Sequence, residues 1–232
     1  MRVLVGPDTD DLAEVYAAPA DPWLRVNMVS TVDGAATGDS GRSGSINNAA
    51  DKVVYHLLRS LADAIVVGAG TARVEGYAPV DKPTVVVSRR GVVPDLLRTG
   101  PPGSVLLATC ADAAGLAEAR AVLGDEHVLV LGTDTVDLVA LKRTLAERGL
   151  THLLSEGGPH LLRDLLAAGA ADELCATVVP RLVAGDHPRI TAGLPVDVPL
   201  RLHALLEADG TLLGRWLVGS PEGTSADGGG RG

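Results

Sequence analysis

Short runs of β-branched residues alternate along this chain with longer amphipathic stretches, and this alternation is the feature that most constrains its fold. The run TVVVS at residues 84–88 is almost continuously apolar, which is typical of a parallel strand buried on both faces of a sheet. Strands are predicted over residues 24–30, 64–67, 84–88, 104–108, 128–131 and 151–154. Because strands that alternate with helices join through right-handed crossovers, the pattern predicts an α/β fold with a mostly parallel central sheet.

The amphipathic stretches between these runs predict the helices. Residues 47–63 form the clearest one, because Val54, Leu58 and Leu61 share one helical face and polar side chains occupy the other. Asn residues at its start favour an N-cap. Further helices are predicted over residues 112–123, 136–148 and 160–168, and a short helix over residues 10–17 is predicted outside the sheet.

The C-terminal part of the chain changes from alternating helices and strands to strands alone. A strand is predicted over residues 173–179, and residues 200–208 and 211–218 predict a β-hairpin whose Asp209-Gly210 pair favours a primed turn. The parallel core is therefore expected to carry an antiparallel C-terminal edge. We expect residues 1–219 to form a single domain and the Gly-rich residues 220–232 to be a disordered tail.

Composition excludes several classes of function. Aromatic residues make up 2% of the chain and there is no Phe, so the core must be aliphatic, and stacking platforms for single-stranded nucleic acid are missing. The net charge of −9 also argues against nucleic-acid binding, which needs a basic face.

Cys110 and Cys175 are in no Cys-x-x-Cys pair, so no metal site is predicted; two reduced thiols are favoured, with a disulfide as the alternative. Without a recognisable leader or membrane span, a cytoplasmic protein that does not bind membranes is expected.

Three glycine-bearing turns follow predicted strands: VDGAAT at 32–37, GAGT at 68–71 and EGGP at 156–159. In an open α/β sheet, ligands bind beyond the carboxyl ends of the strands, and all three turns belong to that edge. The EGGP turn is the best candidate for a phosphate site, because paired glycines allow close backbone approach and a helix that starts at Pro159 adds free N–H donors. An ordinary strand-to-helix turn is an equally good interpretation of either glycine motif taken singly.

Ser88 ends another predicted strand and is followed by Arg89 and Arg90. An Arg at this place in a dinucleotide site accommodates a 2′-phosphate, which favours NADPH over NADH. The competing interpretation, which residue type alone favours, is that Arg89 and Arg90 are two solvated loop arginines.

Two carboxylates, Asp33 and Glu156, stand at predicted strand ends. Either could accept hydrogen bonds from the adjacent N–H groups of an aminopyrimidine or pterin ring. For Asp33 the competing interpretation is common turn chemistry, since Gly34 follows it. We find no Ser/His/Asp triad and no His-Glu-x-x-His zinc motif.

Taken together, three segments resemble the riboflavin-biosynthesis reductases, the family of the RibD C-terminal domain, and most closely its stand-alone pyrimidine reductases. The segments are RVNMVSTVDGAAT, GRSGSINNAADKVVYHLLRSLADAIVVGAGT and LLSEGGPHLLRDLLAAGAADELCATVVPRLVAG, and the resemblance covers residues 24–218. It implies a dihydrofolate-reductase-like three-layer fold. It also implies an NADPH-dependent oxidoreductase that reduces the ribosyl group of a ribosylaminopyrimidine 5′-phosphate to a ribityl group.

The resemblance further implies which residues form the site. The residues expected to bind NADPH are Val29, Ser45, Gly70, Thr71, Glu75, Ser88, Arg89, Gly157, Gly158, Pro159, His160, Leu161 and Leu162. The residues expected to bind the substrate are Asp33, Ser43, Arg59 and Glu156, with Asp33 and Glu156 also the catalytic candidates. The family also implies a homodimer, for which the hairpin at residues 200–218 is a plausible edge.

Two departures from the family pattern concern the substrate half of the site. The segment after GAGT reads ARVEGYAPVDKP and lacks the expected Arg, for which Lys82 is a poor substitute because it has no planar fork. Ala35 stands where a basic residue commonly follows Asp-Gly. These losses leave two alternatives open: a reductase of a folate-like or pterin-like heterocycle, and a nucleotide-binding protein without turnover.

Overall fold

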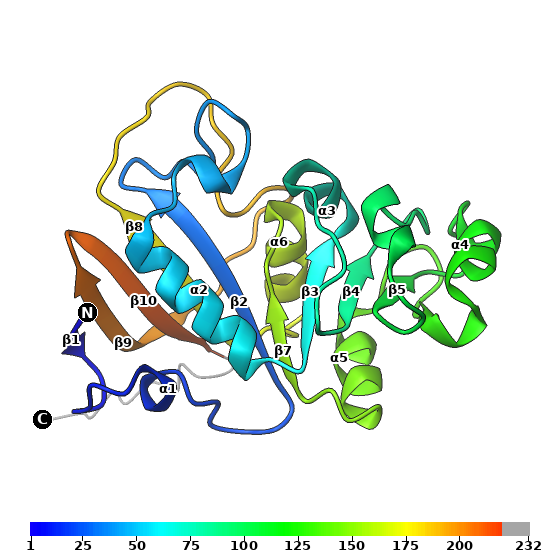
Figure 1. Cartoon of the computed structure of the whole chain (residues 1–232), viewed down its shortest axis with the longest axis horizontal. Coiled ribbons are helices and arrows are strands. Elements are labelled where there is room, and N and C mark those ends of the chain that lie inside the picture. The colour runs from blue at the N-terminus through cyan, green and yellow to red at the C-terminus, as the bar shows by residue number, and fades with distance from the viewer. Residues whose placement is uncertain (220–232) are drawn as a thin grey trace, which may run out of the picture.

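A computed structural model describes residues 1–219, and Figure 1 shows a single sheet running through them. The predicted tail at residues 220–232 lies outside the described residues. The strands are β1 (Arg2–Val5), β2 (Trp23–Thr31), β3 (Ala64–Gly68), β4 (Thr84–Val87), β5 (Val105–Thr109), β6 (Val128–Val130), β7 (His152–Ser155), β8 (Glu173–Val179), β9 (Leu200–Ala208) and β10 (Thr211–Val218). The helices are α1 (Leu12–Val15), α2 (Ala49–Leu61), α3 (Ala69–Glu75), α4 (Leu116–Leu123), α5 (Leu138–Glu147) and α6 (Pro159–Ala167).

The strand order is β1-β9-β10-β8-β2-β7-β3-β4-β5-β6. The run from β8 to β6 is parallel throughout, whereas β10 pairs antiparallel with both β8 and β9. This confirms the predicted α/β fold with a mostly parallel sheet and an antiparallel C-terminal hairpin. Asp209 and Gly210 both have positive φ, 50° and 77°, as a primed turn requires.

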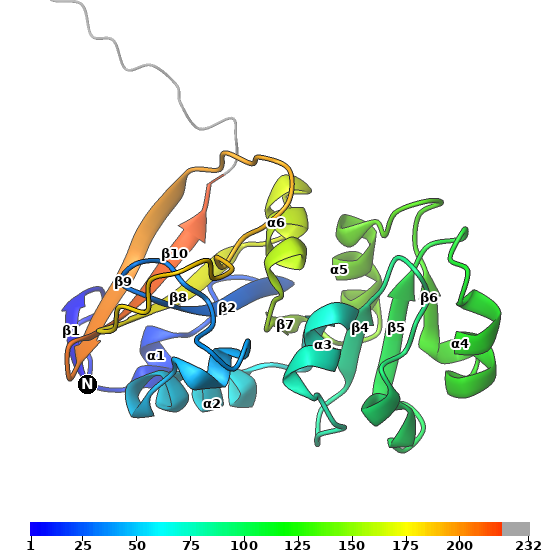
Figure 2. The same cartoon turned by 90° about the horizontal axis from the view of Figure 1, so that it is seen from above.

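Helices cover the two faces of the sheet in different places, and Figure 2 shows the resulting three layers. Leu141 of α5 and Leu162 of α6 pack with Val66 and Val85 on one face. On the other face, α1 and α2 cover the antiparallel half, while α3 and α4 cover β3 to β6. The core is aliphatic, as composition requires, and Tyr16 is the one aromatic side chain among its fully buried residues within 1–219.

Two elements differ from the sequence-based expectations. Only a short helix outside the sheet was predicted before residue 24, but Arg2–Val5 also pairs antiparallel with β9 as an edge strand. Its four residues are mostly exposed, so no buried periodicity announces it. The GAGT segment was interpreted as a turn, but it begins α3, which ends at Gly76 in the left-handed conformation (φ 78°). The helix predicted over residues 112–123 begins only at Leu116.

Candidate functional site

The adjacent parallel strands β2, β7 and β3 bring the three glycine-bearing turns to one edge of the sheet. The Gly68 N–H, at the end of β3, donates to the Gly157 carbonyl at 2.9 Å, and the Glu156 N–H donates to Val66 O at 3.0 Å. A Cβ on Gly158 would overlap the Thr71 hydroxyl. The GAGT and EGGP segments are therefore in direct contact.

Glycine is required at both central positions of EGGP. Gly157 has φ +89°, and a Cβ there would lie 2.9 Å from Met28 Sδ. The Gly157–Gly158 peptide bond is cis. Gly158 is the N-cap of α6 and Pro159 its first residue, as predicted, with no acidic side chain in the first turn. The free N–H groups and positive end of this helix suit a phosphate.

The residues after Pro159 differ in exposure. Leu161 and Leu162 are buried in the core, 6% and 0% exposed, and the Leu162 N–H already donates to Gly158 O at 2.9 Å. His160 is exposed at the helix start.

Glu156 is the centre of a buried hydrogen-bonded cluster. Its side chain is 3% exposed, and Arg59 of α2 binds both carboxylate oxygens, with Nε–Oε1 2.6 Å and Nη2–Oε2 2.7 Å. The Tyr77 hydroxyl donates to Oε2 at 2.6 Å, and the Tyr55 hydroxyl lies 3.4 Å from the same oxygen. The site thus joins two predicted residues into one bidentate ion pair.

Burial comes first among the causes that raise the pKa of Tyr77 and of Tyr55, and the negative charge of Glu156 is the second. Both phenols therefore stay protonated and remain donors at neutral pH. The sequence analysis singled out neither tyrosine. The one available signal was rarity, since the chain has three Tyr residues.

Asp33 lies in the turn after β2 and ties it to the long segment that follows β8. Its carboxylate accepts from the Thr31 hydroxyl and from the N–H groups of Val183 (3.1 Å) and Ala184 (2.8 Å). The Thr31 hydrogen bond is the main cause that lowers the pKa of Asp33 to about 2, with the backbone donors adding to it. Asp33 is therefore ionised at neutral pH.

The predicted serines lie on a loop between β2 and α2. The Ser43 N–H donates to Glu75 Oε1 at 2.9 Å, which ties this loop to the end of α3. The Ser45 hydroxyl accepts from Gly38 N at 2.9 Å and donates to Arg42 O at 2.7 Å. Three residues on the predicted ligand set thus hold the loop in place.

The remaining candidates lie around this edge. Val29 is half-buried near the end of β2. Ser88 is buried after β4, where its hydroxyl accepts from Val92 N at 3.0 Å, and Arg89 is exposed beside it. Gly70 is exposed near the start of α3. Lys82 does not replace the missing Arg, because its Nζ binds the Ser60 carbonyl (3.2 Å) at the end of α2.

The structure also describes the two cysteines. Cys110 and Cys175 are free and buried, which confirms two thiols and not a disulfide. Within residues 1–219, no group of three or more His, Cys, Asp or Glu residues is placed to hold a metal ion. None of the helices in this part of the chain is long and apolar enough to cross a bilayer.

Comparison with known proteins identifies the family. The model of the RibD C-terminal domain family matches residues 22–212. A relative from Methanothermobacter thermautotrophicus, the 2,5-diamino-6-ribosylamino-4(3H)-pyrimidinone 5′-phosphate reductase, is 31% identical over 184 residues, which are 72% of this chain and 82% of that protein. The riboflavin biosynthesis protein RibD of Mycobacterium tuberculosis is 26% identical over 74% of this chain and 49% of its own.

A solved structure agrees with these sequence matches. The pyrimidine reductase-like protein of Corynebacterium diphtheriae superposes with a TM-score of 0.73 at 25% identity, covering 86% of this chain and 92% of that one.

Proposed function

The chain belongs to the RibD C-terminal domain family, and on that premise we propose that it is an NADPH-dependent reductase of a ribosylaminopyrimidine 5′-phosphate. The reaction converts the ribosylamino group of the pyrimidine to a ribitylamino group, as in the riboflavin pathway. The observation that carries the proposal is the contact between the GAGT and EGGP segments, which gathers the glycines and the α6 N-terminus beside Glu156.

The residues at this edge fit a pyridine dinucleotide. Side chains are excluded at Gly157 and Gly158, so the backbone there is bare, and the Thr71 hydroxyl adds a donor. The free N–H groups of α6 supply the positive end that a diphosphate needs. The cofactor-binding set is proposed as predicted, and Ser88 with Arg89 would lie toward the 2′-phosphate.

NADPH supplies a hydride when bound, and the protein's own residues orient and stabilise what receives it. Asp33, Ser43, Arg59 and Glu156 are proposed to hold the substrate. Asp33 is ionised at neutral pH, so its carboxylate attracts a protonated amine or accepts from ring N–H groups and does not itself carry the proton. Glu156 Oε2 accepts the hydrogen bond from the Tyr77 hydroxyl, and the carboxylate fixes the Arg59 guanidinium, which keeps a cation at the substrate end.

The larger assembly is proposed to be a homodimer. On the face of β9 and β10 opposite α1 and α2, no helix lies over the strands within the described residues (Figure 2). Leu202 and Leu212 are exposed, at 38% and 40%. Trp216 of β10 lies opposite Leu202 of β9 in the antiparallel strand pair. Light scattering tests this proposal, and a monomer mass would refute it.

We also propose a cellular location, the absence of nucleic-acid partners and a single domain. Two free, buried thiols suit a reducing compartment, which supports a cytoplasmic location. The net charge of −9 argues against nucleic-acid partners. One sheet spans the described residues, which supports a single reductase domain over residues 1–219.

The proposed function is tested by following nicotinamide absorbance while NADPH is mixed with the protein and a candidate substrate. Ribosylaminopyrimidine 5′-phosphates, both with and without the 2-amino group, should consume NADPH, and NADH should be consumed more slowly. Dihydrofolate serves as the comparison substrate. Oxidation with dihydrofolate alone would refute the proposed substrate, and binding of NADPH without oxidation of it by any substrate would refute the enzyme.

A further inference from the structure

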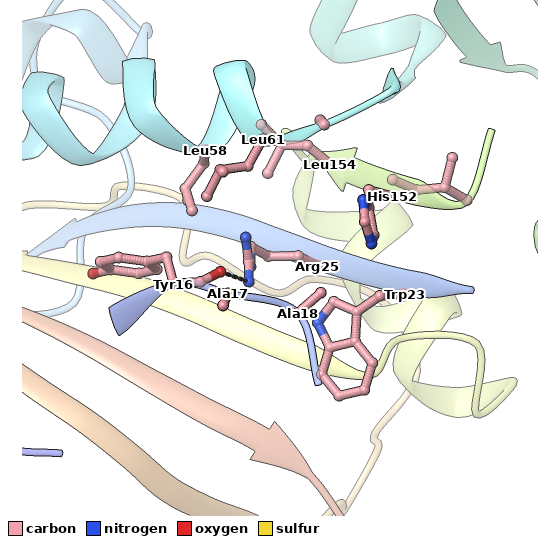
Figure 3. A pocket seen from close by; sticks show the side chains of 11 residues that line it. Tyr16, Ala17, Ala18, Trp23, Arg25, Leu58, Leu61, His152 and Leu154 are labelled. Atoms are coloured by element: carbon pink, nitrogen blue, oxygen red, sulfur yellow. Dashed lines mark hydrogen bonds between the residues drawn. The ribbon is translucent and has the colours of Figure 1, made fainter. Parts of the chain in front are cut away.

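A pocket lies at the end of the parallel strands opposite to the candidate site. It sits where β2 and β7 begin, between these strands, the C-terminal half of α2 and the segment after α1 (Figure 3). Its cavity volume is about 50 Å³, room for a few water-sized atoms, and it is partly open to solvent. The lining residues are Tyr16, Ala17, Ala18, Trp23, Arg25, Leu58, Leu61, Ala62, His152, Leu153 and Leu154. Most of this lining is apolar, so its one arginine stands out.

Arg25 reaches this pocket with one nitrogen unused. Its side chain is 7% exposed. Nε and Nη2 bind Glu173 at 2.8 and 3.2 Å, and Nη2 also donates to Tyr16 O at 2.6 Å. Nη1 makes no hydrogen bond with any described residue, and Figure 3 shows the end of the guanidinium away from Tyr16 O directed toward Leu58 and Leu61. By contrast, all three nitrogens of the neighbouring Arg215 have acceptors.

The charges of this cluster do not balance. Arg25 and Arg215 share one carboxylate, that of Glu173, whose side chain is fully buried. The Cys175 thiol donates to Glu173, and burial followed by the charge of Glu173 raises the thiol's pKa, so it adds no negative charge. Backbone carbonyls of the segment after α1 accept the remaining bonds. Among the described residues, one positive charge is therefore left without a side-chain counter-ion, and the free nitrogen of Arg25 opens into the pocket.

Charged groups at the pocket mouth do not supply that counter-ion. The His152 ring lines the pocket and its Nε2 lies 2.6 Å from Asp21 Oδ1. Both side chains are substantially exposed, at 40% and 65%, and each is the other's partner. Asp63, next to α2, accepts from the backbone N–H groups of Thr151 and His152 and is likewise engaged.

We propose that this pocket binds a short-chain monocarboxylate. The carboxylate would lie on Arg25 Nη1, and the alkyl chain would pack against Leu58, Leu61 and Leu154. One bound anion would bring the buried charges of Arg25, Arg215 and Glu173 to zero. The volume limits the chain to two or three carbons, because the cavity of about 50 Å³ is far smaller than the pockets that hold drug-sized ligands.

Trp23 makes the proposal measurable, because it lines the pocket and the chain has one other tryptophan. In a Trp216→Phe variant, all indole fluorescence reports on Trp23. Propionate should change this fluorescence saturably, with a dissociation constant in the millimolar range. Propionamide has the same size and no charge, and it should produce no saturable change. An equal response to both ligands, or no saturable response to propionate, would overturn the proposal.

Two variants locate the binding. Ala18→Leu adds bulk at a half-exposed position of the lining and should weaken propionate binding by at least about tenfold without disturbing the buried charges. Arg25→Lys keeps a cation but removes the forked nitrogens, and it should abolish binding. If Arg25→Lys does not fold, Ala18→Leu alone decides, and unchanged affinity in it refutes the site. NADPH binding, measured in parallel, should be unaffected by Ala18→Leu because the two sites lie at opposite ends of the parallel strands.

Discussion

Glu156 and Glu173 are both carboxylates held by arginine forks and aromatic donors, yet they lie in different kinds of place. Glu173 begins β8 inside the sheet, where Arg25, Arg215 and Trp23 surround it and its side chain has no exposed surface. Glu156 follows β7 at the end of the strands where the candidate site lies, and its Arg59 partner is 26% exposed. The first cluster holds the chain together, and the second presents charge to a site.

The partners of each cluster explain the difference. Arg25 and Arg215 donate onward to carbonyls of Val15, Tyr16 and Ala17, so the Glu173 cluster fastens the N-terminal segment to the sheet. The Glu156 cluster joins α2, the end of α3 and the start of α6, which are the elements around the glycine turns. The same chemistry therefore serves stability in one place and positioning in the other.

The largest expected effect is on stability. Glu173→Gln leaves two buried guanidinium groups without a carboxylate, so the free energy of unfolding should fall by about 3–5 kcal/mol. Urea denaturation measures it. A loss below about 1 kcal/mol would show that the backbone carbonyls suffice to hold the arginines, and the contrast between the two clusters would fail.

The matched substitution Glu156→Gln should lower activity strongly and the free energy of unfolding only slightly. We expect kcat/KM to fall by about a hundredfold or more, because charge placed for the transition state is lost, with a stability loss of only about 1–2 kcal/mol. Steady-state kinetics and urea denaturation on the same preparation separate the two effects. Unchanged turnover would remove Glu156 from the mechanism.

Much of this architecture could be predicted from the sequence, because buried parallel strands leave apolar runs and the Asp209-Gly210 pair leaves a turn signal. Gly157, Gly158 and Pro159 were predictable as a helix entry for the same reason. The clusters were not. Arg59 and Glu156 are 97 positions apart, and nothing local marks their pairing. Tyr77 is 79 positions from the Glu156 carboxylate to which it donates. The residues of the strand Arg2–Val5 are mostly exposed, so no buried face marks it in the sequence.

A smaller effect is expected beside Glu156, at the glycines. Gly158→Ala places a methyl group on the Thr71 hydroxyl and should weaken NADPH binding by about tenfold. Calorimetry measures the affinity. Gly70→Ala is the informative companion, because a Cβ there has nothing within 4 Å, so any loss of affinity would come from contact with the ligand itself. If Gly158→Ala binds NADPH normally, the contact between the two segments does not shape the site.

The smallest effect concerns Asp33, an exposed carboxylate that contrasts with both buried ones. Because its folded pKa is lowered to about 2 from an ordinary 3.8, its hydrogen bonds stabilise the fold fully above the ordinary value, and this contribution is lost as the pH falls toward 2. Asp33→Asn should therefore be less stable than the wild type at neutral pH, and the difference should vanish in strong acid. Urea denaturation at both pH values measures it, and a pH-independent difference would contradict the assigned hydrogen bonds.

The central claim is that the GAGT and EGGP segments together bind the diphosphate of a phosphorylated pyridine nucleotide. Isothermal titration of NADPH into the wild-type protein tests it most directly. The account predicts a saturable heat with one site per chain, and a weaker one with NADH. Absence of any binding heat with NADPH would contradict it.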